Sequence, residues 1–165
     1  MQKQIAAALL LAVSFFGATV TQTPARNSSD NNLIASNNAK PKKVKLKWYK
    51  DMNSALAEAR NEGREFVFAH VGAKWCGPCR FMEKSIFPDP RVKQFLAEHY
   101  VNCVIDDDSA EGKAMTHNFG MRGIPALFVF DNNGNLRGKM SGSTANPDVF
   151  IQAVQLMTER QLNRS

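Results

Sequence analysis

The chain has 165 residues and a formal net charge of +6, with 21 lysines and arginines against 15 acidic residues. The excess of positive charge is confined to its N-terminal part. Residues 26–47 hold six basic residues and one acidic residue, whereas residues 48–165 hold fourteen of each. The part of the chain that is long enough to build a core is therefore formally neutral, and nucleic-acid binding has no support there.

The first 25 residues have the pattern of a secretory signal peptide or an N-terminal membrane anchor. A short basic start precedes an uncharged apolar run over residues 5–16, and small and polar residues follow. No Ala-x-Ala triplet marks a cleavage site, so Ala18 and Ala25 are the candidates. The apolar run is shorter than the ~20 residues of a bilayer span. We expect export to the periplasm, either with cleavage or with the N-terminus kept as a membrane tether.

Residues 26–44 have the composition of a disordered basic linker. Asn, Ser, Lys and Ala dominate this segment, and large apolar residues are scarce apart from Leu33 and Ile34. Such a segment cannot bury enough apolar surface to offset the entropy lost on ordering. We expect a solvated spacer, and contact of its basic residues with anionic lipid is the alternative.

The apolar and polar pattern of residues 45–165 predicts a single domain in which strands and helices alternate. A short strand over residues 45–49 is followed by a helix that ends at Gly63. The apolar run of residues 66–71 predicts a buried strand. The next segment is helical in pattern, and Pro88 and Pro90 break it.

Further elements are predicted from apolar runs between polar breaks: a strand over residues 100–105, a helix over 110–118, and a hairpin of strands over 126–130 and 136–140 around the Asp131–Asn135 turn. A last helix begins at Asn146-Pro147, and its expected apolar face is Val149, Phe150, Ala153, Val154 and Met157. This order indicates an α/β fold, with a central mixed sheet that is covered by helices on both faces and closed by an antiparallel hairpin.

The segment Trp75-Cys76-Gly77-Pro78-Cys79-Arg80 lies where an apolar strand gives way to a helix. Two cysteines three residues apart can close a small disulfide there, and a helix start favours a thiolate on the first sulfur. Such a pair can pass a disulfide to or from another protein. No second Cys-x-x-Cys or histidine pair completes a zinc site, and a c-type haem would need His where Arg80 stands, so we expect no metal.

This motif and a second one, Gly120-Met121-Arg122-Gly123-Ile124-Pro125, resemble those of the thioredoxin family over residues 45–160. The flanking segments 53–63, 72–74 and 87–92 resemble the exported branch of the family, which includes the C-terminal domain of a transmembrane periplasmic disulfide reductase. The resemblance implies a thioredoxin fold and a thiol:disulfide oxidoreductase, with protein disulfides as substrates and a membrane or soluble thiol reductant for recycling. It implies no small-molecule cofactor, and we expect a monomer.

The resemblance also implies a role for each matching residue. Cys76 would be the attacking thiolate and Cys79 the resolving thiol of a redox-active disulfide. A cis bond at Ile124-Pro125 would leave the backbone groups of Ile124 free to pair with an extended substrate segment. The remaining substrate-binding positions would be Trp75, Gly77 and Pro78.

The sequence departs from the family pattern at one buried position. Thioredoxins carry an aspartate six residues before the first cysteine, where this chain has His70, and their partner lysine aligns with Asn102. His70 is a candidate proton relay for Cys79. The alternative is a core histidine that is hydrogen-bonded to backbone.

Other polar residues are expected to be structural. Cys103 is predicted to be a small buried side chain, with a regulatory disulfide as the alternative. Residues 106–108 are expected to form a solvated loop that caps the next helix. Glu83 is expected to form helix-surface pairs with Arg80 and Lys84.

The dipeptide Gly77-Pro78 favours the reducing direction. Reducing members of the family have potentials of about −270 mV, against about −120 mV for the strong periplasmic oxidant. A disulfide oxidase or isomerase is the alternative enzyme. A non-catalytic adaptor or chaperone that binds extended segments at Ile124-Pro125 is the alternative from a different class.

Overall fold

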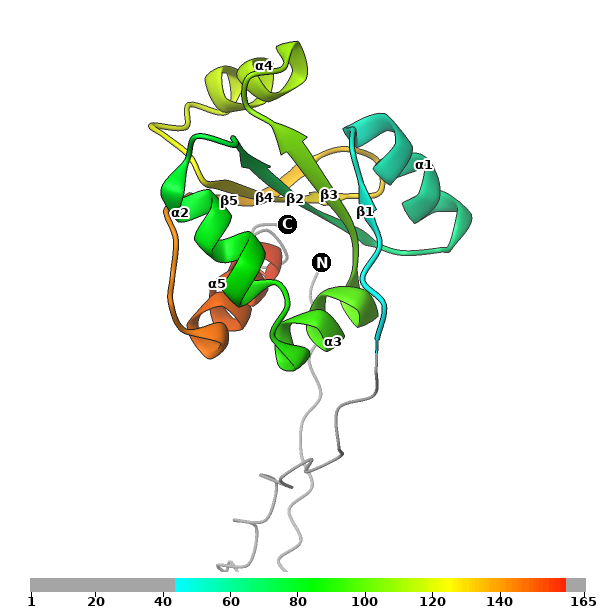
Figure 1. The fold of residues 1–165 in the computed structure, drawn as a ribbon. Helices are drawn as coiled ribbons and strands as arrows, with labels where there is room; N and C mark the ends of the chain where they lie inside the picture. The colour runs from blue at the N-terminus through cyan, green and yellow to red at the C-terminus, as the bar shows by residue number, and fades with distance from the viewer. Residues whose placement is uncertain (1–43, 160–165) are drawn as a thin grey trace, which may run out of the picture. The chain divides into compact units, whose positions relative to one another are not determined.

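The computed structural model describes residues 44–159 (Figure 1). The predicted signal or anchor, residues 1–25, and all but the last residue of the predicted linker, residues 26–44, lie outside the described residues. Between residues 44 and 159 no helix has the length and apolar character that crossing a bilayer requires. The elements, in chain order, are β1 (Trp48–Tyr49), α1 (Met52–Asn61), β2 (Phe66–Gly72), α2 (Gly77–Phe81), the π-helical segment η1 (Met82–Ile86), α3 (Pro90–His99), β3 (Tyr100–Asp106), α4 (Ala110–Asn118), β4 (Ala126–Asp131), β5 (Leu136–Ser141) and α5 (Pro147–Glu159).

The five strands form one mixed sheet in the order β1-β3-β2-β4-β5. β3 is parallel to β1 and β2, whereas β4 is antiparallel to β2 and β5. The central strands β2 and β3 pair from Phe66 opposite Tyr100 to Gly72 opposite Asp106. Both strands therefore end at the same edge of the sheet, where the backbone N–H of Asp107 donates to the carbonyl of Gly72 over 2.8 Å. This bond holds the loops after β2 and β3 side by side, where the cysteine motif begins.

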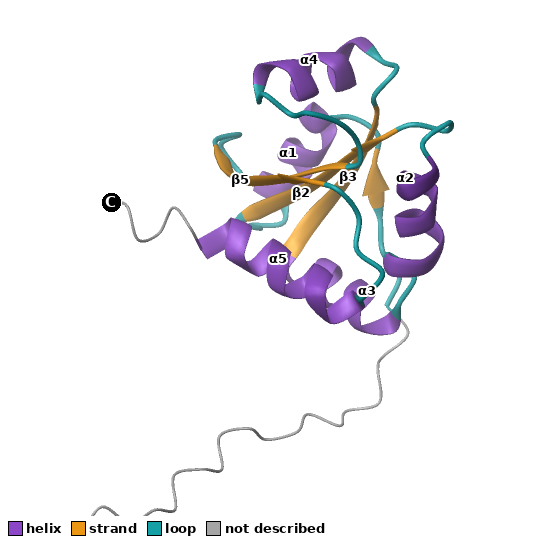
Figure 2. Cartoon of the chain, turned by 90° about the vertical axis from the view of Figure 1, so that its left-hand side faces the viewer, coloured by secondary structure: helices purple, strands orange, loops and turns teal. Residues whose placement is uncertain are grey.

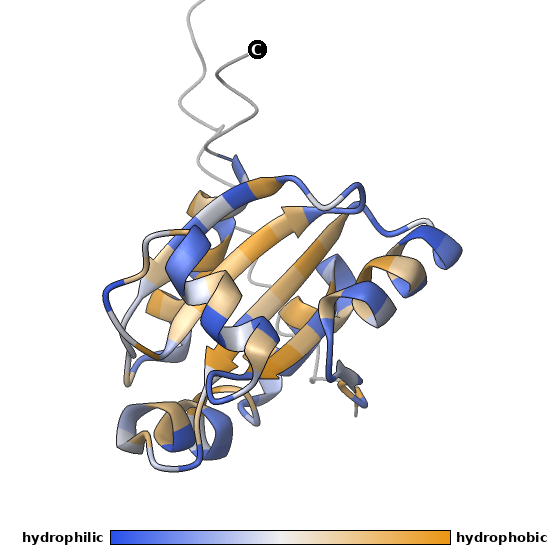
Figure 3. Cartoon of the chain, turned by 90° about the horizontal axis from the view of Figure 1, so that it is seen from above, coloured by the Kyte–Doolittle hydropathy of each residue, from blue (hydrophilic) through white to orange (hydrophobic). Residues whose placement is uncertain are grey.

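Helices cover both faces of the sheet (Figure 2). On one face η1, α3 and α5 pack around Phe68, whose ring centroid lies 5.7 Å from that of Phe150 and 6.2 Å from that of Phe87. On the other face α1 and α4 contribute Ala55 and Met115 to a second apolar cluster. The central strands are mainly hydrophobic in Figure 3, and almost all of their residues are buried. The predicted α/β thioredoxin fold, with one mixed sheet and helices on both faces, is confirmed.

Two predicted elements differ from the structure in extent. The first strand is Trp48–Tyr49 rather than residues 45–49, because only these two residues pair with β3. The helix after the cysteine motif is π-helical from Met82 to Ile86 before the chain reaches Pro88. The break expected at the prolines is present, and α3 then begins at Pro90, with Asp89 as its N-cap.

One expected core position of α5 is wrong. Phe150, Val154 and Met157 are buried, but Val149 is 49% exposed. Consecutive residues of a helix point about 100° apart, so Val149 cannot share the stripe that its neighbour Phe150 follows.

Candidate functional site

The cysteine motif forms the turn between β2 and α2. Cys76 is the N-cap of α2, and Pro78 lies in the first helical turn, where its missing N–H leaves no helical hydrogen bond unmade. Cys76 and Cys79 form a disulfide, with sulfurs 1.97 Å apart. The backbone N–H of Cys79 donates to Sγ of Cys76 over 3.2 Å. The start of α2 therefore presents the Cys79 N–H to the first sulfur, and no N–H at Pro78 is left without a partner.

The two cysteines differ in their access to solvent. Cys76 keeps 5% of its surface exposed, whereas Cys79 has none. Both pack with Ala73 and Ile124 in a small apolar cluster. Thiol:disulfide exchange begins with the attack of one sulfur on another, so the partner sulfur must be able to reach its target. Of this pair, only Cys76 keeps any exposed surface, and that fraction is small.

The Ile124-Pro125 segment borders the disulfide. Its peptide bond is cis, as the family resemblance implied. The carbonyl of Pro125 accepts a hydrogen bond from the N–H of Gly142 over 2.9 Å. Among residues 44–159 no hydrogen bond involves the backbone N–H or carbonyl of Ile124. These two groups are therefore available to an extended segment of another chain.

Trp75 is held in place although it is exposed. The residue is 64% exposed, and its indole Nε1–H donates to the two carboxylate oxygens of Asp108 over 3.0 and 3.2 Å. The role expected for residues 106–108 needs correction, because the side chain that caps α4 is Ser109, and Asp108 anchors Trp75 instead. The contact exists because the loops after β2 and β3 are tied together.

His70 lies in the central strand β2, opposite Val104 of β3 and Leu127 of β4. It has no exposed surface, and neither ring nitrogen has a hydrogen-bond partner in the described part of the chain. Burial lowers its pKa from 6.5 to about 4, so the imidazole is neutral near pH 7. The alternative expectation was a core histidine bonded to backbone; His70 is a core residue, but the hydrogen bond to backbone is absent from the described residues.

Gly72 gives the His70 ring its place next to Cys79. A Cβ atom built on Gly72 would lie 2.9 Å from Cε1 of His70 and 3.1 Å from Cβ of Cys79. The ring and the buried cysteine therefore converge on the same point of the backbone. Asn102, at the position of the family's lysine, makes no hydrogen bond to His70 among the described residues; its amide donates to the carbonyls of Leu96 and Tyr100.

Glu83 lies next to His70, a contact that the sequence did not predict. Its Oε1 lies 3.8 Å from Nδ1 of His70, and its side chain is 45% exposed. The expected helix-surface pairs with Arg80 and Lys84 are absent from residues 44–159, and Arg80 donates instead to the carbonyl of Lys74. No sequence pattern indicated this contact, because Glu83 lies in the π-helical segment Met82–Ile86.

Cys103 is a free thiol buried in β3. Burial raises its pKa to about 12, which keeps it protonated and unreactive at neutral pH. The predicted small buried side chain fits this environment. Over residues 44–159 no three side chains of His, Cys, Asp or Glu converge in a way that could hold a metal ion.

Residues 52–158 match a family model described as a thioredoxin-like domain. The chain belongs to this family. It is 26% identical over 149 residues to the thiol:disulfide interchange protein DsbD of Haemophilus influenzae (strain Rd), a match that covers 87% of this chain and 26% of the relative. It is 29% identical over 92 residues to the DsbD of Escherichia coli K12, covering 55% of this chain and 16% of the relative. The chain thus spans about a quarter or less of the length of these curated relatives.

Solved structures resemble this thioredoxin-like domain as well. The solution structure of a putative disulphide-isomerase from Bacteroides thetaiotaomicron has a TM-score of 0.61 and 25% identity, and the match covers 73% of this chain and 98% of that one. The reduced C-terminal domain of Neisseria meningitidis DsbD has a TM-score of 0.53 and 23% identity, covering 62% and 90%, and it shares the fold. The family resemblance is confirmed. A Cys-x-x-Cys disulfide in a thioredoxin-like domain supports the predicted enzyme class, a thiol:disulfide oxidoreductase.

Proposed function

We propose that this protein reduces disulfides of other proteins in the cell envelope through Cys76 and Cys79. The observation that carries the proposal is the Cys76–Cys79 disulfide at the start of α2, in which Cys76 keeps 5% of its surface exposed and Cys79 none. In the reduced protein the Cys76 thiolate attacks a substrate disulfide, forms a mixed disulfide and releases one substrate thiolate. Cys79 then attacks Sγ of Cys76, releases the second substrate thiolate and regenerates the disulfide seen here.

The local geometry supports these roles. The Cys79 N–H that donates to Sγ of Cys76 also stabilises a thiolate on that sulfur, and stabilising the thiolate lowers the pKa of the thiol. His70 is neutral and borders Cys79 at Gly72, so in this proposal it accepts the Cys79 proton before the second step. The two electrons given to the substrate come back from a membrane or soluble thiol reductant.

The substrate-binding part of the proposal rests on the surface around Cys76. Trp75, Gly77 and Pro78 are neighbours of the two cysteines in the chain, and Ile124 packs against both cysteines. An extended substrate segment would exchange hydrogen bonds with the N–H and carbonyl of Ile124, as in strand addition limited to one residue. This mode reads backbone rather than side chains, so it suits varied protein substrates.

Trapping the mixed disulfide tests the assignment of the two cysteines. Cys79→Ser protein, mixed with a disulfide-containing protein such as insulin, is expected to accumulate a covalent adduct that dithiothreitol releases. Cys76→Ser protein is expected to form none, and Cys103→Ala serves as the matched control that keeps full insulin reduction. A Cys76→Ser/Cys79→Ser protein that still reduces insulin at the wild-type rate would overturn the proposal.

The direction of exchange is tested by the equilibrium reduction potential. A putative disulphide-isomerase is among the structures that resemble this chain, so the isomerase direction is the second candidate. We expect a potential of about −270 mV, as in reducing members of the family, from titration against dithiothreitol buffers. A value close to about −120 mV would instead assign an oxidant.

The location in the envelope is supported by the signal or anchor pattern of residues 1–25. A fusion of the full chain to alkaline phosphatase, which is active only after export, tests it. An inactive fusion in a Gram-negative host would remove this part of the proposal while leaving the chemistry of the cysteines untouched.

A further inference from the structure

A cavity of about 880 Å³ lies away from the disulfide, between the segment that leads into β1 and the helical segments η1 and α3. Its size falls within the range of about 300–1,000 Å³ that is usual for small-molecule sites. None of the residues around Cys76 lines it. The lining residues are Val44, Lys45, Leu46, Trp48, Lys50, Glu83, Phe87, Pro88, Pro90, Lys93 and Val104.

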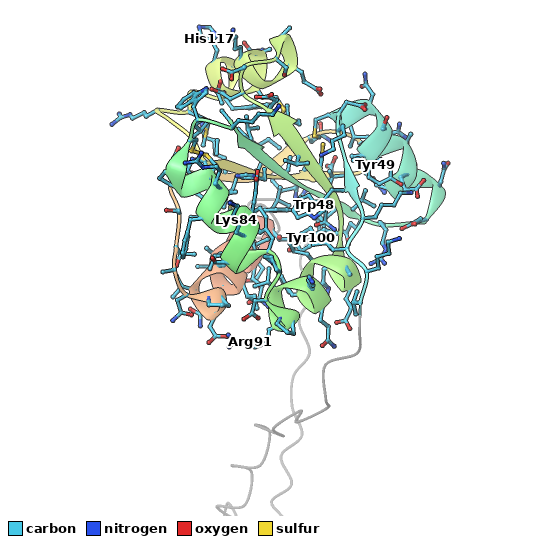
Figure 4. All side chains as sticks on the ribbon, viewed as in Figure 1. Trp48, Tyr49, Lys84, Arg91, Tyr100 and His117 are labelled. Atoms are coloured by element: carbon cyan, nitrogen blue, oxygen red, sulfur yellow. A yellow bond between two sulfur atoms is a disulfide. The ribbon has the colours of Figure 1, made fainter. Side chains whose placement is uncertain are left out.

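The walls of the cavity are mainly apolar. The rings of Trp48 and Phe87 meet there, with centroids 5.1 Å apart, and Leu46 packs against the same apolar cluster. Figure 4 labels Trp48 where β1 faces the helical segments. A binding site built from aromatic and aliphatic side chains, with a few polar groups to orient the occupant, is the usual composition of a small-molecule pocket.

The charges that line the cavity are unbalanced. Lys45, Lys50 and Lys93 all line it, and across residues 44–159 none of the three forms an ion pair. Glu83 is the one acidic lining residue, and its carboxylate lies near His70. Three lysines with no ion-pair partner within residues 44–159, beside an apolar surface, attract an occupant that carries a negative charge on an apolar body.

We propose that this cavity binds a small-molecule carboxylate with an aliphatic body. The aliphatic part packs on Leu46, Trp48 and Phe87, and the carboxylate lies among the lysines. The proposal does not depend on the proposed exchange activity, because it involves neither cysteine.

Binding can be followed through Trp48. The chain has two tryptophans, so Trp75→Phe leaves Trp48 as the sole indole. Titration of this full-length variant with octanoate is expected to change the Trp48 emission in a saturable way, with a Kd below about 1 mM. Octanol has the same aliphatic body without the charge and is expected to bind at least about fivefold more weakly.

A matched pair of lysine variants tests the charge. In the same Trp75→Phe background, Lys45→Gln/Lys93→Gln is expected to weaken octanoate binding about fivefold or more. Lys84→Gln/Lys113→Gln removes the same charge from surface positions outside the cavity and is expected to leave the Kd unchanged. Three results would overturn the proposal: a flat titration with octanoate, equal Kd values for octanoate and octanol, or equal losses in the two lysine variants.

Discussion

Acidification is expected to destabilise the oxidised protein through His70. The imidazole is fully buried without a hydrogen-bond partner, and its pKa falls from 6.5 to about 4 on folding. Between these two values the unfolded chain binds a proton that the folded chain does not bind, so the free energy of unfolding decreases as the pH decreases. At about 1.36 kcal/mol per pKa unit, this one residue lowers the free energy of unfolding by about 3 kcal/mol between pH 7 and pH 4.

The assay compares wild-type and His70→Leu protein by urea unfolding at pH 7, 6, 5 and 4, with the disulfide intact. The carboxylates with lowered pKa, such as those of Asp89 and Asp131, titrate in both proteins, so the difference between the two curves isolates His70. The free energy of unfolding of His70→Leu, minus that of the wild type, is expected to increase by about 3 kcal/mol from pH 7 to pH 4. His117→Gln controls for the loss of one imidazole. A difference that stays constant within about 0.5 kcal/mol would refute the reasoning, since extrapolated free energies carry about that uncertainty.

Gly72→Ala places a methyl group 2.9 Å from the ring of His70 and is expected to cost about 1–3 kcal/mol in thermal or urea unfolding. Gly123→Ala, which meets no atom within 4 Å, is its control, and equal losses would contradict the close packing. Cys103 is expected to resist iodoacetamide at pH 8 in the folded protein and to react in urea; labelling in both states would disprove its burial. Tyr100→Phe removes a 2.7 Å hydrogen bond to α5 and is expected to lower stability by about 1 kcal/mol, whereas an unchanged melting temperature would show that the bond contributes nothing.

Features with local causes were predictable from the sequence. The hairpin turn is one example: the Asp131 carboxylate accepts from the N–H groups of Asn133 and Asn135, and Gly134 takes φ +87°. The cysteine motif is another, because a cap, a proline in the first turn and the two cysteines all lie within five residues. Short-range chemistry of this kind does not depend on how the rest of the chain packs.

Features with non-local causes were not predictable. Trp75 meets Asp108, 33 residues later, only because β2 and β3 end at the same edge of the sheet. Glu83 approaches His70 from a π-helical segment that no apolar pattern indicates. The missing hydrogen bonds of His70 depend on the packing around it. The roles of the N-terminal 43 residues, which lie outside the described part of the chain, stay predictions.

The anchored indole of Trp75 has a consequence for recognition. An exposed side chain usually loses rotational freedom when a partner docks on it, at a cost of about 0.5–1.5 kcal/mol. Two oxygens of Asp108 already restrict this ring in the free protein. A partner that docks on Trp75 therefore meets a preorganised surface, and it pays little of that entropy at the moment of contact. Replacing Asp108 would keep the indole of Trp75 but remove its restraint, so a partner would lose affinity by the entropy cost of ordering the ring.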